Sequence, residues 1–248
     1  MNKLILLFIL TICASSSFSQ LLSSDDIYNK VVLLYQMNEG KSASGSGFLI
    51  TGGQRFFLVT AKHVADSLQI DFAKICFRTD QGKVLEFPLK AFLKTNSARA
   101  LNDFSDFFVI ELISFDTASN SLLKRSNFEV ANLANNKEVP RNFELVTFGY
   151  PYVDFEHFTP ISFKSAFASN LVNIKINGLK NMCYCYLLEH PGMEGFSGGP
   201  VVFGVKDRSN QGANMTGVVG IITGTFYDKT GGKFAIVSPT FQLLDLIK

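Results

Sequence analysis

Tryptophan is absent from this chain of 248 residues, whereas phenylalanine occurs 25 times. We therefore expect phenylalanine to fill the core that other proteins build partly with tryptophan. Charged residues make up only 18% of the chain, and the net charge is +2. Because no long basic run occurs, nothing indicates a nucleic-acid-binding protein. A hydrophobic content of 47% excludes a disordered chain.

Cysteine is scarce, with four residues in the chain. Cys13 lies in the N-terminal segment, and Ile12 precedes it where lipoprotein signals have a small residue, so we expect no lipid anchor there. The others, Cys76, Cys183 and Cys185, are odd in number, so at least one thiol stays free or pairs between chains. Cys183 and Cys185 would share one face of a strand and cannot easily bond each other. No Cys/His spacing suits zinc, so we expect small buried hydrophobic residues and no metal.

Residues 1–19 have the layout of a secretory signal peptide. Met1 to Lys3 supply a basic start, an apolar run extends from Leu4 to Ile12, and Ser17 to Ser19 resemble a cleavage site. The apolar run is too short to cross about 30 Å of hydrocarbon. A buried N-terminal helix is the alternative. We expect an exported protein, periplasmic or secreted, with no stable membrane insertion after cleavage.

Short apolar segments separated by turn residues predict an all-β fold. Asn177-Gly178 predicts a hairpin between two of them. Long helical periodicity is missing, except from Pro239 to Ile247. The polar stretch Ser114–Arg141 would cross between two halves. The predicted strands are Val31–Tyr35, Phe48–Thr51, Phe56–Thr60, Ile75–Phe77, Val84–Phe87, Phe107–Leu112, Leu145–Phe148, Leu171–Ile176, Cys183–Leu188, Pro200–Val205, Val218–Thr223 and Lys233–Val237.

A serine lies among glycines in Gly195–Pro200, where tight turns expose its hydroxyl and gather backbone N–H groups. An ordinary Gly/Ser loop is the alternative. The motif also fits the nucleophile elbow of α/β-hydrolases, a fold whose catalytic histidine follows the serine. The histidines His63, His157 and His190 all precede Ser197, which excludes that fold.

A serine nucleophile needs a base and an orienting acid. His63 lies where an apolar strand stops, and Asp106 begins another apolar strand. Asp106 read alone is also a plausible strand-end turn residue. Asp103 is the rival acid, but the apolar strand starts directly after Asp106. We therefore expect His63, Asp106 and Ser197 to act together.

The segments around His63, Asp106 and Ser197 resemble, in the same order, those of the trypsin-like (chymotrypsin-fold) serine peptidases, especially the bacterial Deg/HtrA type. Ser44–Ile50 resembles the glycine-led strand before the catalytic histidine, and Thr60–Val64 the T-A-A-H segment. Gly195–Pro200 resembles the G-x-S-G-G-P nucleophile loop, Val219–Thr223 the strand that binds substrate backbone, and Phe234–Pro239 the closing strand.

The resemblance implies two antiparallel six-stranded β-barrels with a short C-terminal helix and the active site between them. Residues 20–248 would form one protease domain, with halves at roughly 25–125 and 140–248, after the signal peptide 1–19. The resemblance implies a protein or peptide substrate, no nucleic acid and no cofactor or metal. No PDZ-like segment follows the terminal helix.

The resemblance also assigns roles. Ser197 would attack the scissile carbonyl, His63 would carry the proton, and Asp106 would hold the histidine tautomer. The N–H groups of Gly195 and Ser197 would form the oxyanion hole. Substrate would contact His190, Pro191, Thr223 and Gly224.

Two departures from the family stand out. Phe196 replaces the usual Asp or Asn, so activation by capture of a new N-terminus is not expected. Pro191 stands where an Asp would select basic side chains, so a preference for Lys or Arg is not expected either. His157 most simply has no catalytic part.

The first functional hypothesis is an exported serine endopeptidase. The second is a protease fold used for binding, with a weak or silent site, motivated by Phe196 and the missing accessory domain. An esterase using the same triad is chemically adjacent to the first.

Overall fold

The computed structural model describes residues 21–38, 41–94, 99–101, 105–134, 139–151, 158–176, 181–207, 213–227, 229–244 and 246–247. The predicted signal peptide and the turn Asn177-Gly178 lie outside these residues, as do Asp103 and His157. Within the described part, no helix is both long enough and apolar enough to cross a membrane.

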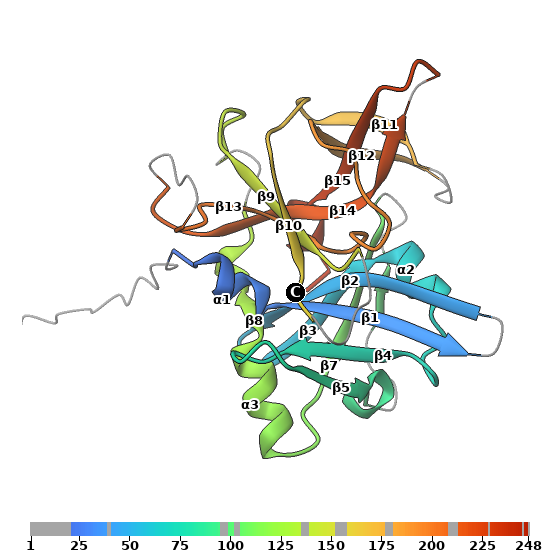
Figure 1. The fold of residues 1–248 in the computed structure, drawn as a ribbon, viewed down its shortest axis with the longest axis vertical. Helices are drawn as coiled ribbons and strands as arrows, with labels where there is room; N and C mark the ends of the chain where they lie inside the picture. Colours follow the sequence, from blue (N-terminus) through green and yellow to red (C-terminus); the bar gives the residue numbers. More distant parts are fainter. Residues whose placement is uncertain are drawn as a thin grey trace, which may run out of the picture.

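The chain folds into two β-sheets, one above the other in Figure 1. The first sheet has eight strands in the order β5-β4-β1-β2-β3-β7-β6, with β8 pairing on β2. Its strands are β1 (Val31–Asn38), β2 (Lys41–Gly52), β3 (Arg55–Ala61), β4 (Lys74–Arg78), β5 (Val84–Pro88), β6 (Arg99–Leu101), β7 (Phe107–Leu112) and β8 (Asn127–Glu129).

The second sheet has seven strands in the order β10-β9-β13-β14-β15-β12-β11. It contains β9 (Leu145–Gly149), β10 (Ile161–Ser165), β11 (Val172–Lys175), β12 (Met182–Leu188), β13 (Pro200–Phe203), β14 (Gly217–Tyr227) and β15 (Lys233–Pro239). Pairs of strands are antiparallel throughout, apart from β2 with β8. All twelve predicted strands are confirmed, and β11 and β12 pair as the hairpin prediction required.

The strand numbers differ from the six per half that the resemblance implied. Three strands had no clear apolar run in the sequence: β6, β8 and β10. Two of them have only three residues each, too few for alternation to appear. The short β8 joins the first sheet because the chain after the helix α3 (Thr117–Arg125) returns along β2.

Among the described residues, three helices besides the terminal α4 (Phe241–Leu244) correct the sequence prediction. They are α1 (Ser24–Tyr28), α2 (Lys62–Ser67) and α3, which lies inside the stretch predicted to be a simple crossing. All are too short to show a 3.6-residue period clearly. Side chains cap two of them, Ser23 at α1 and Asp116 at α3. The described residues also include two short 3₁₀ helices, η1 (Leu89–Phe92) and η2 (Val130–Asn132).

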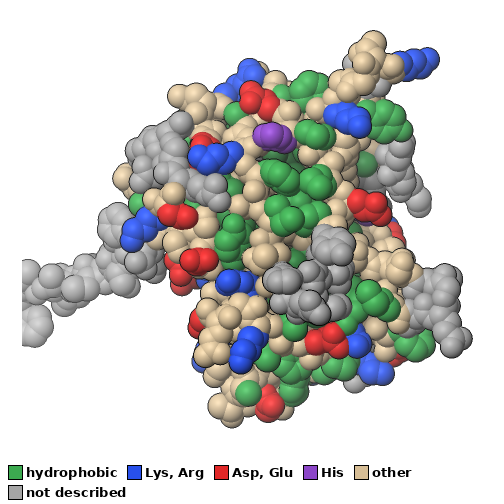
Figure 2. Space-filling view, in the orientation of Figure 1, with side chains coloured by type: hydrophobic (Ala, Val, Ile, Leu, Met, Phe, Trp, Pro, Cys, Tyr) green, Lys and Arg blue, Asp and Glu red, His purple; other side chains and the backbone are tan. Residues whose placement is uncertain are grey.

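Phenylalanine fills the core, as its abundance predicted. Phe48 and Phe128 meet edge to face across β2 and β8, with ring centroids 5.7 Å apart. The main core continues from the first sheet into the second, where Phe148 joins it. On the face seen in Figure 2, hydrophobic side chains also gather over the second sheet, and charged ones lie mostly around the edge. The two sheets are therefore held together by a shared apolar interior.

Candidate active site

His63 lies at the junction of β3 and α2, and Asp106 holds that junction. Ala61 at the N-terminus of α2 provides no side-chain cap. Instead, the Lys62 N–H donates to the Asp106 carbonyl at 2.8 Å, and the His63 N–H donates to Asp106 Oδ1 at 3.1 Å. The antiparallel register that pairs Ala61 with Phe107 brings the two residues together. Asp106 therefore satisfies helix N–H groups that would otherwise lack acceptors.

The second carboxylate oxygen of Asp106 contacts the imidazole nitrogen Nδ1 of His63. Asp106 Oδ2 is 2.5 Å from His63 Nδ1. The Asp106 side chain is 4% exposed, whereas that of His63 is 50% exposed. A buried carboxylate facing Nδ1 favours the tautomer that carries its proton there, which leaves Nε2 as a proton acceptor. The structure thus brings together two of the three residues predicted to act in concert.

Ser197 lies in a segment of tight turns, Gly195–Pro200, which we call the glycine loop. Gly195 and Gly198 have φ angles of +87° and +84°, in the region that favours glycine. The loop is tied to β14, because the Gly198 N–H donates to the Ile222 carbonyl at 2.7 Å and the Ile222 N–H donates to the Gly199 carbonyl at 3.0 Å. These bonds fix the backbone on both sides of the serine.

The glycine loop packs directly on the first sheet. A Cβ at Gly198 would lie 2.1 Å from the Ser46 carbonyl oxygen and 2.9 Å from the Ala61 nitrogen. The Ser46 N–H donates to the Ser197 carbonyl at 2.8 Å. Ser197 is therefore held against the end of β3, two residues before His63.

The hydroxyl of Ser197 and the imidazole of His63 are not hydrogen-bonded to each other in the described structure. Catalytic hydrogen bonds are often long in the absence of substrate. The N–H groups of Gly195 and Ser197 donate to no acceptor among the described residues.

Phe196 anchors the glycine loop in the second sheet. Its side chain is 2% exposed and lies 5.4 Å from the Phe163 ring, centroid to centroid. A Cβ at Gly149 would lie 2.9 Å from Phe196 Cδ1, so the ring sits tightly against β9. The aromatic residue thus fixes the loop by apolar burial, where the resembling family has a polar side chain.

A small pocket lies beside the glycine loop, with a volume of about 10 Å³. His190 and Pro191, both predicted to contact substrate, are among its lining residues, and the His190 ring stacks on Phe163 with ring centroids 6.1 Å apart. Thr223 and Gly224, the other two predicted contacts, are not among its lining residues. The Thr223 hydroxyl donates to the Ile236 carbonyl at 3.4 Å. The lining consists of Thr147, Phe163, Leu188, His190, Pro191, Gly192, Met193, Phe196, Ile222 and Ala235.

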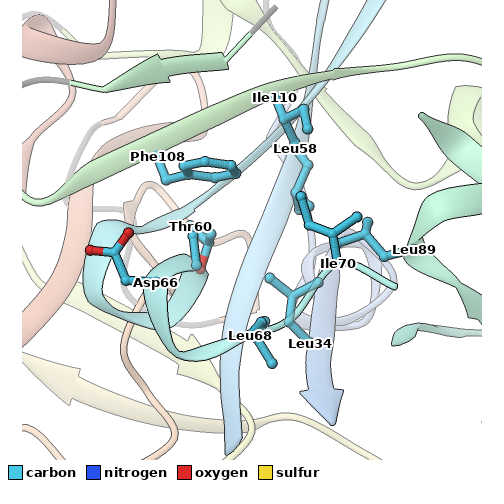
Figure 3. A pocket seen from close by; sticks show the side chains of 10 residues that line it. Leu34, Leu58, Thr60, Asp66, Leu68, Ile70, Leu89, Phe108 and Ile110 are labelled. Carbon is cyan, nitrogen blue, oxygen red and sulfur yellow. The ribbon is translucent and has the colours of Figure 1, made fainter. Parts of the chain in front are cut away.

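A larger cavity of about 190 Å³ lies beneath α2, the helix that carries His63. Figure 3 shows mostly apolar side chains from β1, β3 and β7 meeting beside this helix, with Asp66 on the helix at the edge of the group. Asp66 pairs with Lys62 at 2.5 Å. The cavity is apolar and contributes no group to the candidate site.

Sequence reasoning assigned no role to Ser46, although its motif Ser44-Gly45-Ser46-Gly47 was visible. Its hydroxyl bonds to residues about 100 to 150 positions away, which no local pattern encodes. Among the described residues, no group of three or more His, Cys, Asp or Glu side chains could hold a metal ion.

No protein-family model matches the chain, and no curated protein matches it by sequence. Solved structures do match. The MamO protease domain from Magnetospirillum magneticum aligns with a TM-score of 0.61 at 14% identity, covering 90% of this chain and 98% of that domain. For Deg5 the TM-score is 0.55 at 17% identity, covering 88% of this chain and 87% of that one.

The HtrA-type protease AlgW, solved with a tripeptide, gives a TM-score of 0.56 at 16% identity, covering 90% of this chain. This chain spans only 61% of the AlgW chain. Together these likenesses show that the chain has the trypsin-like fold of HtrA/Deg-type protease domains.

Proposed function

We propose that this chain, which has the fold of HtrA-type protease domains, is an exported serine endopeptidase. Ser197 is its nucleophile, His63 the general base and Asp106 the acid that orients the base. The observation that carries the proposal is the contact of 2.5 Å between the buried Asp106 carboxylate and His63 Nδ1. A second support is the glycine loop, which holds Ser197 against the strand leading to His63.

In the proposed reaction, His63 Nε2 takes the Ser197 hydroxyl proton as Oγ attacks the peptide carbonyl carbon. The N–H groups of Gly195 and Ser197 stabilise the oxyanion, which is worth about 3–4 kcal/mol per donor in comparable sites. His63 returns the proton to the leaving amine, and an acyl-enzyme remains. Water then attacks the acyl-enzyme carbonyl with His63 again as the base, which releases the carboxylic acid product and restores the Ser197 hydroxyl. All of these steps use groups of the chain itself and of water, and the substrate is a protein or peptide.

Labelling with a fluorophosphonate tests the proposal. The chain without residues 1–19 is compared with Ser197→Ala and His63→Ala, each checked for folding by circular dichroism. We expect label on the parent chain alone, and a peptide library should then reveal cleavage products. Hydrolysis of small esters without any peptide cleavage would indicate an esterase instead.

A second candidate is a binding protein with a protease fold. It is favoured by the volume of the pocket beside Ser197, about 10 Å³, which leaves little room for a substrate side chain. A folded parent chain that takes no label would support this second candidate over the first.

A further inference from the structure

Ser46 on β2 is fully buried and lies at the contact between the two sheets. Its hydroxyl donates to the Gly195 carbonyl at 2.7 Å. The same oxygen accepts the Tyr150 N–H, from the segment after β9, at 2.8 Å. A carbonyl can only accept, so the single hydroxyl proton must point at Gly195. The direction of this hydrogen bond is therefore fixed.

The backbone of Ser46 makes a further bond to the glycine loop, from its N–H to the Ser197 carbonyl at 2.8 Å. Ser46 thus binds the carbonyl groups of both Gly195 and Ser197. These are the two residues whose N–H groups would form the oxyanion hole. Ser46, on a strand of the first sheet, therefore bonds to both of these residues of the glycine loop, which leads into the second sheet.

Gly195 needs such a hold because glycine has a wide choice of backbone conformations. Its φ of +87° belongs to a turn in which the Phe196 N–H donates to the Met193 carbonyl at 3.1 Å. The Gly195 carbonyl and the Gly195 N–H belong to neighbouring peptide planes that meet at the Gly195 Cα, so the angle between them depends on φ and ψ of Gly195. Once Ser46 anchors the carbonyl plane, the direction of the Gly195 N–H varies only with these two angles. The Ser46 hydroxyl selects one of these conformations before substrate arrives, and preorganised donors are what stabilise an oxyanion.

We propose that Ser46 is a positioning residue, whose hydroxyl sets the oxyanion hole by holding the Gly195 carbonyl. This inference rests on the proposed function for its catalytic consequence, but the hydrogen-bond role stands on the geometry alone.

The test replaces the hydroxyl and keeps the backbone bond, in Ser46→Ala. A matched control is Thr240→Val, which removes another fully buried hydroxyl, one that lies 2.8 Å from the Ala134 carbonyl and 2.9 Å from the Val218 carbonyl. If Ser46→Ala does not fold, Ser46→Cys is measured in its place, because a thiol is only a weak donor.

Two readouts are needed. Amide hydrogen exchange is followed in peptides covering residues 148–151 and 193–199, and hydrolysis of p-nitrophenyl acetate gives kcat and KM. For Ser46→Ala we expect exchange at least about tenfold faster in these peptides, and kcat lower by about 10²-fold with little change in KM, the loss expected for one oxyanion donor. For Thr240→Val we expect neither change.

The outcomes separate the two proposals. Faster exchange in Ser46→Ala, with a parent chain that neither hydrolyses the ester nor takes the fluorophosphonate, leaves the positioning role intact and overturns the proposed function. Exchange and kcat that match the Thr240→Val values overturn the role of Ser46 while the proposed function survives. A rise in KM for Ser46→Ala without loss of kcat would also contradict the role of Ser46, since that result reports a change in substrate binding.

Discussion

Asp106 contacts His63 through both of its carboxylate oxygens, one on the backbone N–H at 3.1 Å and one on the imidazole at 2.5 Å. The same residue that would orient the ring also caps the helix that carries it. Ring direction and helix position are therefore set together.

Asp106→Asn separates these two tasks. An amide oxygen still accepts the His63 N–H, but an amide NH₂ facing Nδ1 forces the proton onto Nε2, where the base must be free. We expect fluorophosphonate labelling to slow by roughly 10⁴-fold with the fold retained. Asp66→Asn, on the exposed side of the same helix, serves as the control and should label within about twofold of the parent, since it is a surface change. Equal labelling of both variants would remove Asp106 from the mechanism.

Gly198→Ala should destroy the site through a clash. Its φ is +84°, and a Cβ would lie 2.1 Å from the Ser46 carbonyl oxygen. Gly231 has a similar φ of +96° with nothing within 4 Å of its Cβ position, so Gly231→Ala isolates the cost of the backbone conformation. We expect about 1–2 kcal/mol of destabilisation at Gly231. At Gly198 we expect a larger loss together with abolished labelling, measured by urea unfolding and fluorophosphonate reaction. Similar unfolding free energies for the two variants would show that the loop yields to the added methyl.

Phe196→Ala should destabilise the protein by about 3–5 kcal/mol, because it leaves a cavity in the core of the second sheet. Guanidinium unfolding gives the value. Phe226 is 42% exposed, so Phe226→Ala should cost no more than about 1 kcal/mol. A small effect at Phe196 would mean that the ring does not anchor the glycine loop.

The thiols of the described part should resist alkylation in the native state. Cys76, Cys183 and Cys185 are free and buried. Burial raises the pKa of the Cys76 and Cys185 thiols from 9.0 to about 12. Iodoacetamide at pH 8 should therefore leave all of them unmodified until guanidinium is added, as intact mass will report. Modification of the folded protein would contradict their burial.

The same shifts give a pH dependence of stability. Because the folded-state pKa values lie above those of the unfolded chain, the contribution is complete below pH 9 and is lost as the pH rises from 9 toward 12. Urea midpoints across that range should fall. Cys76→Ala should reduce the slope, and an unchanged slope in that variant would exclude this thiol as a source.

The sequence predicted the strands well where an apolar run is continuous, as in Phe107–Leu112, because buried strands need such runs. It failed for β8, whose three residues gain their strand conformation only by pairing with β2. The helix α2 was missed for a similar reason. Its start is stabilised by Asp106, a residue more than forty positions away.

The same distinction between local patterns and long-range contacts applies to the candidate site. His63, Asp106 and Ser197 could be predicted as site residues because the proposed chemistry requires particular residue types in a familiar order. Ser46 was not, since its partners Gly195 and Tyr150 are 149 and 104 positions away. The buried environment of Phe196 likewise depends on β9 and β10, which meet it only in the folded chain.

The hydrogen bonds of Leu22 and Ser24 have a consequence for the maturation of the proposed exported protein. The Leu22 N–H donates to Thr216 Oγ1 at 2.6 Å, and the Ser24 N–H donates to Asp207 Oδ1 at 2.7 Å. Cleavage after Ser19 would leave only two residues before Leu22, and this tether spans at most about 3.3–3.6 Å per residue. In the proposed exported protein, a signal peptidase acting on residues 1–19 would need this bond to be free of the folded body. Removal of that proposed signal peptide would therefore precede the attachment of Leu22 and Ser24 to the turns after β13 and before β14.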